Sequence, residues 1–498
     1  MKAVRVVVAL ATLCLASGAT ASERRSLSSV DVRACGATVP AATKSVLTIS
    51  PDGDGIADCA AVRFRLARPA EVAFVVSQRK PHAQVVHVER LRAQAGPTTV
   101  VWAPPPTIAE RTYVTRLLLR GREGVSLGGP VIRVRGPWAR FVQESYLPGD
   151  TAMLRVETGG ATLTLEVVDA ATGEVVAGPR RVQGPVAGVR VGRWRPGVYV
   201  ARLSGGEVVT QAPLVVRSAP SARPRVAVVL PTSTWQAYNF LDVDGDGTGD
   251  TWYASRRRES ARLDRPFLGS GLPPFFGRYD RPFLRWLAES GRRADVLADV
   301  DLDRVPDPRT LDRRYDLLVF PGHHEYVTEH ELDLVEGFRD RGGNLAFLSA
   351  DAFHWRVARD GLVLRRKDQW RLRKHPRPEA ALVGVQYLAS DDGTHRGSYV
   401  VRNTRCAPWL FRGTGLVRGA RFGWSGVEIS ATTADSPKGT CVVAEIPNLL
   451  GPRRTAQMAY YQTPAGAKVF AAGAFCLAND SPVVHRLLDN LWTRLSRP

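Results

Sequence analysis

The pattern of apolar residues changes once along this chain of 498 residues, and that change limits the folds it can adopt. Up to residue 217, apolar and polar residues alternate in short runs, which is typical of half-buried strands. Residues 218–224 form a linker rich in Pro, Ser and Ala. After the linker, continuous apolar runs alternate with amphipathic segments, which indicates strands followed by helices. The sequence therefore predicts β domains followed by an α/β domain.

The part before the linker predicts two small β-sandwiches of the immunoglobulin-like kind. Short alternating runs separated by turns occupy residues 36–135 and again residues 136–218. The segment SPDGDGIAD at 50–58, together with Ala95–Trp102, resembles the immunoglobulin-like domain of flagellar hook-capping proteins. That resemblance implies a spacer or a binding module.

Residues 225–498 predict a doubly wound parallel sheet, because apolar strands and helices alternate there. The expected helices end at Gly291, at the pair Gly342 and Gly343, and near the C-terminus. The expected strands are 225–231, 294–297, 315–322, 344–349 and 468–475, and the expected helices are 281–290, 328–341 and 483–495.

Residues 1–21 predict a secretory signal peptide and therefore a secreted protein. Lys2 and Arg5 precede a short apolar stretch, and Ala19 and Ala21 form an A-x-A cleavage site. No apolar run reaches the ~18–20 residues of a membrane helix, so no transmembrane segment is expected.

Export would permit disulfides between the five cysteines after residue 21. Cys35 and Cys59 bracket a short segment and are expected to pair. Cys406 and Cys441 are the next pair, which leaves Cys476 as a buried free thiol. Sequence alone does not determine this connectivity.

The net charge of +20 comes from 68 Lys and Arg against 48 Asp and Glu, and Arg carries most of it. Such Arg usage is weak evidence for a nucleic-acid partner, so we expect a solvated basic surface and no specific nucleic acid. The basic charge also raises the hypothesis that the protein binds anionic polymers. Two other hypotheses, given below, are favoured over it.

Polar side chains follow three of the expected parallel strands at their carboxyl ends, where open α/β sheets bind ligands. Tyr238 follows the first strand, His323 and Glu325 follow the third, and Asp351 and His354 follow the fourth. A carboxylate, an imidazole and a phenol in one pocket allow metal binding by hard oxygen ligands. They equally allow metal-free acid/base chemistry by His and Glu.

Six motifs in the expected α/β domain occur together in one known family. They are TWQAYN at 234–239, LDRPF at 263–267, FLRWL at 283–287, DVDL at 299–302, PGHHEYVT at 321–328 and GGNLAFL at 342–348. In this order they resemble the C-terminal domain of the N,N-dimethylformamidase large (beta) subunit. The resemblance covers about 225–498. It implies a flavodoxin-like fold similar to class I glutamine amidotransferases, without their cysteine nucleophile.

The resemblance also implies an iron centre that hydrolyses the C–N bond of a linear amide. Matched by motif, the iron ligands are Tyr238, Tyr279 and Glu325, and His323 would shuttle the proton. Asp351 stands in the loop where the family often has Asn, and it is the second catalytic candidate. The substrate would be a small amide or a cell-envelope amide.

The sequence departs from the family in ways that keep another function open. His324 stands where the family usually has Asp, and Val327 stands where it often has Trp. The β domains and the signal peptide differ from the cytoplasmic enzyme, and no small subunit is evident. The alternative is a catalytically silent, secreted binding or surface protein that uses its immunoglobulin-like modules.

A loop just after Tyr238 has the composition of a calcium site. Asp242, Asp244, Asp246 and Asp250 alternate with small residues, so their oxygens can converge on one cation. An EF-hand would need Glu where this chain has Tyr253, so we expect a calcium loop of another kind, with an Asp/Gly turn as the alternative.

Overall fold

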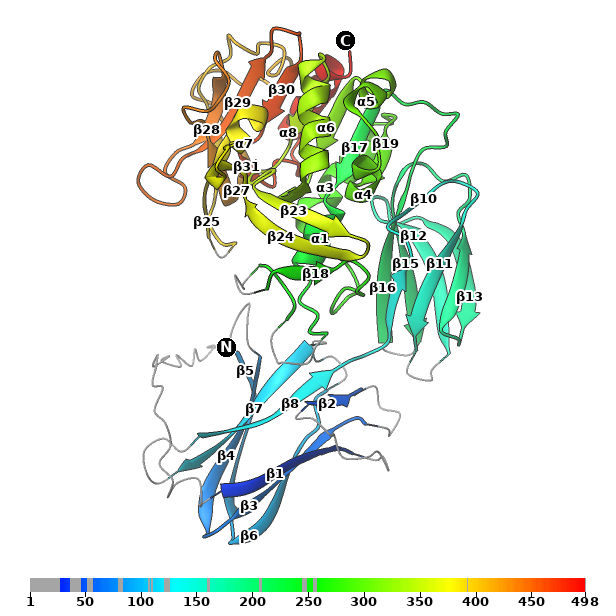
Figure 1. Ribbon diagram of the computed structural model, residues 1–498, viewed down its shortest axis with the longest axis vertical. Helices are drawn as coiled ribbons and strands as arrows, with labels where there is room; N and C mark the ends of the chain where they lie inside the picture. The colour runs from blue at the N-terminus through cyan, green and yellow to red at the C-terminus, as the bar shows by residue number, and fades with distance from the viewer. Residues whose placement is uncertain are drawn as a thin grey trace, which may run out of the picture. The chain divides into compact units, whose positions relative to one another are not determined.

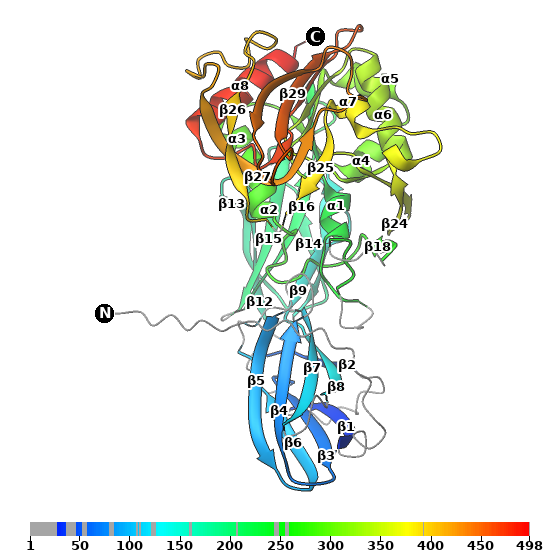
Figure 2. The same ribbon diagram turned by 90° about the vertical axis from the view of Figure 1, so that its left-hand side faces the viewer.

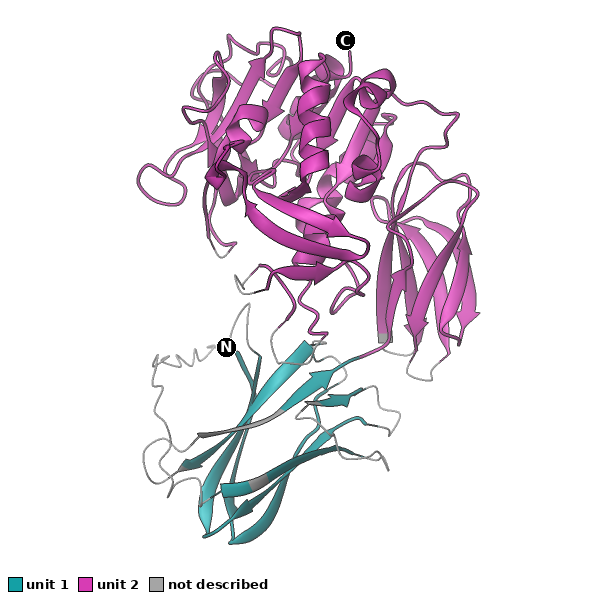
Figure 3. Ribbon diagram, in the orientation of Figure 1, with its two compact units in different colours: residues 1–135, 244–248 teal, residues 136–243, 249–498 magenta. Residues whose placement is uncertain are grey.

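The computed structural model forms two compact units, residues 1–135 with 244–248 and residues 136–243 with 249–498 (Figure 3). The expected signal peptide lies outside the residues that the structure describes. None of the helices among the described residues is long and apolar enough to cross a membrane. The described residues are 27–35, 46–51, 57–78, 84–105, 108, 111–120, 126–158, 162–205, 208–243, 249–253, 258–391 and 393–497.

The first unit is a β-sandwich whose two sheets enclose one apolar core (Figures 1 and 2). Alternate residues of β3 (Ala60–Leu66) are buried, as the sequence pattern predicts. Phe64 from one sheet and Phe74 from the other lie in this core. One sheet has the order β1 (Leu27–Ala34), β3, β6 (Gly96–Trp102); the other has the order β2 (Val46–Ile49), β8 (Ser126–Val134), β7 (Arg111–Arg120), β4 (Ala70–Gln78), β5 (Gln84–Ala93).

The second unit begins with another sandwich, again with one core between its sheets. Its Val198 and Val200 belong to the same apolar cluster as Leu284 and Leu287 of α3 (Arg281–Glu289), so the sandwich and the α/β part share a core. The sheets are β10 (Ser145–Tyr146), β16 (Val208–Val216), β15 (Gly197–Gly205), β12 (Leu163–Asp169), β13 (Val175–Val182), and β14 (Val186–Arg190), β11 (Thr151–Glu157), β9 (Trp138–Phe141).

The large sheet of the second unit is mixed, which corrects the expectation of a parallel sheet. Five neighbouring strands are parallel: β19 (Asp295–Ala298), β17 (Val226–Leu230), β20 (Leu317–Phe320), β22 (Asn344–Phe347) and β30 (Lys468–Ala471). The others pair antiparallel: β29 (Ala456–Gln462), β28 (Cys441–Ile446), β26 (Arg396–Val401), β27 (Arg421–Ala431), β25 (Gln386–Ser390) and β31 (Ala474–Phe475). Short turns such as the one between β29 and β30 allow only antiparallel pairing, because parallel strands need long crossovers.

Helices cover both faces of this sheet. Val228 of β17 lies in the cluster that includes α3 and α8 (Pro482–Leu495), whereas Val229 lies in the opposite cluster with α6 (Glu329–Asp340). The three longer helices agree with the sequence prediction. The remaining helices are α1 (Thr232–Ala237), α2 (Phe276–Tyr279), α4 (Asp299–Asp303), α5 (Pro308–Arg314), η2 (Trp370–Leu372) and α7 (Glu379–Val383).

Both expected disulfides are confirmed. Cys35 is bonded to Cys59 in the first unit, and Cys406 is bonded to Cys441 in the second. Cys476 is a free cysteine, and burial raises the pKa of its thiol to about 11. The thiol is therefore protonated and a weak nucleophile at neutral pH.

Candidate functional site

The strand-end loops after β20 and β22 are held side by side by a small sheet. Its strands are β18 (Ser260–Arg262), β24 (Val363–Gln369), β23 (Trp355–Asp360) and β21 (Tyr326–Thr328). β21 and β23 pair in parallel directly after the two loops. The backbone N–H of Trp355 donates to the carbonyl of Glu325 at 2.9 Å. These contacts place the acidic side chains of both loops next to each other.

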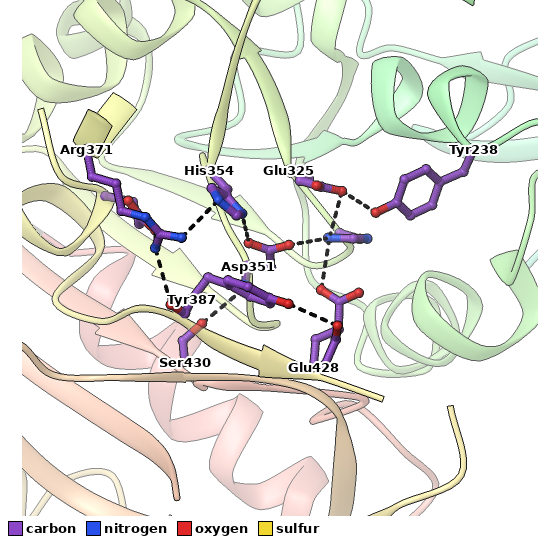
Figure 4. Close-up of polar contacts among 11 residues, drawn as sticks. Tyr238, Glu325, Asp351, His354, Arg371, Tyr387, Glu428 and Ser430 are labelled. Carbon is purple, nitrogen blue, oxygen red and sulfur yellow. Dashed lines mark hydrogen bonds and ion pairs between the residues drawn. The ribbon is translucent and has the colours of Figure 1, made fainter. Parts of the chain in front are cut away.

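Four side chains that the sequence predicts at the strand ends form one buried cluster (Figure 4). Nε2 of His323 lies 3.5 Å from Oε2 of Glu325 and 3.5 Å from Oδ2 of Asp351. The hydroxyl of Tyr238, the residue that ends α1, donates to Oε2 of Glu325. All four are at most 9% exposed, so solvent and salt screen the charges among them much less than at the protein surface.

Glu428 of β27 completes the cluster, and the sequence interpretation missed it. Its Oε2 lies 3.5 Å from Nε2 of His323, and the residue is 9% exposed. Val427, just before it, has a φ of +73°, which is strained for a β-branched residue. Asp351 also has a positive φ, of 51°. Such strain concentrates at functional sites.

Hydrogen bonds from neighbouring residues orient Asp351. Nδ1 of His354 lies 2.7 Å from Oδ1 of Asp351, and Ser430 Oγ accepts a hydrogen bond from the Asp351 backbone N–H at 3.1 Å. Nη2 of Arg371 lies 3.2 Å from Nε2 of His354. Nη1 of the same arginine donates to Glu379 Oε1 at 2.8 Å. Arg371 and Glu379 lie in a segment with no strand-end signal, so no sequence pattern could have identified them.

The electrostatics of the cluster favour a bound cation. Burial and the neighbouring Asp351 raise the pKa of Glu325, and burial with Asp351 and Glu325 raises that of Glu428 well above its usual value. Burial alone would raise the pKa of Asp351 too, but His354 and His323 hold it below its usual range. Three buried carboxyl groups therefore repel one another when ionised, and a cation among them would relieve that repulsion.

The donor atoms fit a metal ion. One ligand atom each from His323, Glu325 and Asp351 lies within 4.8 Å of the other two. Nε2 of His323 and Oε2 of Glu428 are buried and make no hydrogen bond to any described residue. Carboxylate oxygens, a phenol and an imidazole together suit a hard or borderline transition metal such as iron.

Tyr279 lies near the cluster, but no hydrogen bond joins it to the other described site residues. Its ring packs on Phe475 with centroids 5.0 Å apart, and Phe475 packs on His323 at 4.6 Å. Burial raises the pKa of Tyr279 well above its usual value. These contacts close a circuit of neighbouring rings: Tyr238, Tyr253, Phe275, Tyr279, Phe475 and His323. Tyr238 and Tyr279 stand at opposite positions of this circuit.

The two departures from the family lie outside the carboxylate cluster. Nε2 of His324 lies 3.8 Å from Oδ1 of Asp299, and its ring packs on Phe320. Burial lowers the pKa of His324 to about 3, so it is a neutral side chain at physiological pH. Val327 is buried in the apolar cluster that contains α6.

The expected calcium loop is only partly described. Asp244 and Asp246 lie outside the described residues. Asp242 is buried, and Asp250 accepts a hydrogen bond from the N–H of Val243 at 2.8 Å and pairs with Arg258 at 3.1 Å. Calcium binding here stays a prediction.

Gly322, the residue before His323, lies so close to Asp280 and Pro231 that only glycine fits there. A Cβ there would overlap Oδ1 of Asp280 and lie 3.0 Å from Cγ of Pro231. Asp280 is buried and bonded by Nε1 of Trp235 at 3.3 Å, so it has little room to move.

Gly322→Ala is therefore expected to lower the free energy of unfolding by about 1–3 kcal/mol, as overpacking does. Thermal unfolding of the purified protein measures the loss. Gly277→Ala is the matched control, because a Cβ on Gly277 meets nothing within 4 Å among the described residues. Equal melting temperatures for both variants would contradict the close packing at Gly322.

Residues 187–480, more than half of the chain, match a family described as N,N-dimethylformamidase beta subunit-like, C-terminal. The comparison with curated proteins gave no match. Three solved structures share weak likenesses, with the chain spanning less than half of the first. The N-terminal four Ig domains of Dscam1 isoform 4.44 share 13% identity over 35% of this chain and 43% of that chain, with a TM-score of 0.15. The BSP domain of a biofilm associated protein shares 14% identity over 38% of this chain and 30% of that chain, with a TM-score of 0.14. Murine CEACAM1b shares 9% identity over 38% of this chain and 100% of that chain, with a TM-score of 0.14.

Proposed function

Because this chain belongs to the N,N-dimethylformamidase beta subunit-like, C-terminal family, we propose that it is a metal-dependent hydrolase of an amide C–N bond. The observation that carries the proposal is the buried convergence of Tyr238, His323, Glu325 and Asp351 (Figure 4). A buried group of carboxyl, imidazole and phenol side chains with perturbed pKa values is typical of catalytic sites.

Glu325 and Tyr238 would hold the metal, with Tyr279 as the third ligand by family resemblance. Asp351 is a further donor within reach of the same point, and His323 would remain unligated so that its Nε2 can take up a proton. A bound iron would polarise the amide carbonyl and lower the pKa of water, which is how metal ions assist hydrolysis. Binding would also require the Tyr238 hydroxyl to give up the proton that it now donates to Glu325.

His323 is placed to move the proton. Its Nε2 faces three carboxyl groups at 3.5 Å and makes no hydrogen bond to a described residue. It would accept a proton from the attacking water at Nε2 and donate it to the departing nitrogen, so that amide and water become acid and amine. Glu428 and Asp351 would stabilise the imidazolium between these two transfers.

The proposal also includes a fold similarity, export from the cell and a bound calcium ion. Five parallel strands with helices on both faces support a fold similar to class I glutamine amidotransferases. Two disulfides support export, and with it the signal peptide expected at residues 1–21. A calcium ion at Asp242 and Asp250 would brace the segment that follows Tyr238.

Metal content and the visible absorption spectrum of the purified protein test the proposal. We expect iron and a broad tyrosinate-to-iron band, and Tyr238→Phe should remove most of that band. Tyr460→Phe is the control, since Tyr460 packs on Trp409 in the core, away from the cluster. If no transition metal binds even after reconstitution with iron, the site is not a metal centre, and a silent binding protein becomes the better interpretation.

A further inference from the structure

His354 is a buried imidazole beside the cluster, and the proposed hydrolysis does not use it. The residue is 4% exposed, and each of its two ring nitrogens has a polar neighbour (Figure 4). Nδ1 lies 2.7 Å from Oδ1 of Asp351, and Nε2 lies 3.2 Å from Nη2 of Arg371. The ring also stacks on Tyr387, with centroids 5.0 Å apart. Turning the ring over would place carbon atoms where both nitrogens now lie, so its orientation is fixed.

Arg371 is held firmly against His354. Its Nη1 donates to Oε1 of Glu379 at 2.8 Å and to the carbonyl of Tyr387 at 3.3 Å. Trp370, the residue before it, is fully buried, and its backbone N–H donates to the carbonyl of His354 at 3.4 Å. The guanidinium therefore cannot turn away from the imidazole without breaking these contacts.

This contact bears on where the imidazole carries its proton. A guanidinium has only donors, so Nη2 of Arg371 donates and Nε2 of His354 accepts. The proton of a neutral ring is then on Nδ1, which donates to Asp351. Burial lowers the pKa of His354, but Asp351 and the other carboxyl groups nearby raise it above its usual value. These groups favour a second proton on the ring, and Arg371 opposes it, because an Nε2–H would point at a guanidinium N–H.

The position of this proton sets the charge that Asp351 presents to the cluster. Arg371 and Glu379 form an ion pair at 2.8 Å, and the Glu379 side chain is only 1% exposed, so these two charges balance each other. A neutral His354 leaves the carboxylate of Asp351 uncompensated, and its Oδ2 faces Nε2 of His323 at 3.5 Å. An imidazolium in place of the neutral ring would cancel much of that charge, because interactions between buried charges are strong.

Resting on the proposed hydrolase function, we propose that Arg371 is a positioning residue. It holds His354 as the neutral tautomer with its proton on Nδ1, so that Asp351 keeps its negative charge for His323 and for a bound metal. Arg371 acts through His354 and Asp351 and not on the reacting atoms. The retained charge stabilises the proton that His323 takes up during hydrolysis.

The nitrogen NMR signals of His354 in the full, metal-free protein test this inference without any turnover. The protein is prepared with isotope-labelled histidine, and the signals of His354 are those that His354→Gln removes. At neutral pH we expect one protonated and one unprotonated ring nitrogen, with the proton on Nδ1. Arg371→Met removes the donor to Nε2, so we expect a second proton there and two protonated nitrogens.

Arg373→Met is the matched control, because Arg373 lies two residues further along and pairs with Glu329 at 3.1 Å. It should leave the signals of His354 unchanged. Arg371→Met leaves the buried carboxyl of Glu379 without its ion pair, which could prevent folding. In that case the double variant Arg371→Met with Glu379→Gln removes both charges and repeats the test.

Three NMR results would overturn the inference: two protonated nitrogens in the unsubstituted protein, a single proton on Nε2, or an unchanged pattern in the folded variant without Arg371. In the iron-loaded protein we expect Arg371→Met to lower kcat for a formyl amide by about 10–100-fold with little change in KM, as the loss of a residue behind a metal ligand does. An unchanged kcat in that variant would also overturn the inference. No turnover by any form of the protein, together with the expected NMR signals, would contradict the hydrolase proposal and leave the assignment of the His354 proton intact.

Discussion

Glu325→Gln is expected to remove the bound metal and the hydrolytic activity with it. Glu325 receives the Tyr238 hydroxyl, faces His323 at 3.5 Å and supplies one of the three clustered donor atoms. Even residues that only support a metal ligand contribute 10–100-fold to metal affinity, so the loss of the ligand itself should cost at least about 100-fold. Metal analysis after dialysis and turnover of a formyl amide measure both effects.

The fold should survive this substitution. Glutamine has the volume of glutamate and removes a buried carboxyl whose pKa burial already raises, so the melting temperature should not fall below that of the metal-free unsubstituted protein. Glu289→Gln, at an exposed position of α3, is the control that should retain metal. A folded Glu325→Gln variant that retains stoichiometric metal would contradict the proposed centre.

Phe338→Ala is expected to have the largest effect on stability. Phe338 is fully buried on α6, and its ring packs so closely on the backbone of Gly343 that a Cβ there would overlap it. Removing a buried Phe side chain costs about 3–5 kcal/mol, because transfer free energy is lost and a cavity remains. Chemical denaturation, monitored on the second unit, measures this change.

Asp340→Ala on the same helix is the comparison. The Asp340 side chain is 61% exposed and pairs with Arg339 only at the surface, so its removal should change stability by less than about 1 kcal/mol. Similar losses of unfolding free energy in the two variants would contradict the burial of Phe338 in the core.

Local periodicity accounts for the parts of the fold that the sequence predicts. The alternating residues of β3 and the helical face of α6 with Leu332, Val335 and Phe338 are buried as expected. Burial of an alternating or helical face depends mainly on residues near in sequence, so a single chain shows it. The mixed half of the large sheet was not predicted, because strand direction there depends on turns and long-range pairing.

The candidate site also contains residues that the sequence predicts and one that it does not. Tyr238, His323, Glu325 and Asp351 follow apolar strands, and the rule that ligands gather at carboxyl ends of parallel strands was enough to expect them together. Glu428 lies on an antiparallel strand, and only the pairing of β27 with β25, β26 and β31 brings it within 3.5 Å of His323.

The sequence by itself indicated the family and the strand-end residues, because motifs and spacings along the chain carry that information. It favoured the two disulfide pairs, which the structure then confirmed. Only the tertiary structure decided that Glu428 and Arg371 join the cluster. These residues come from segments far apart in the chain. Their meeting depends on sheet register and on the packing of distant loops, which leave no local pattern to read.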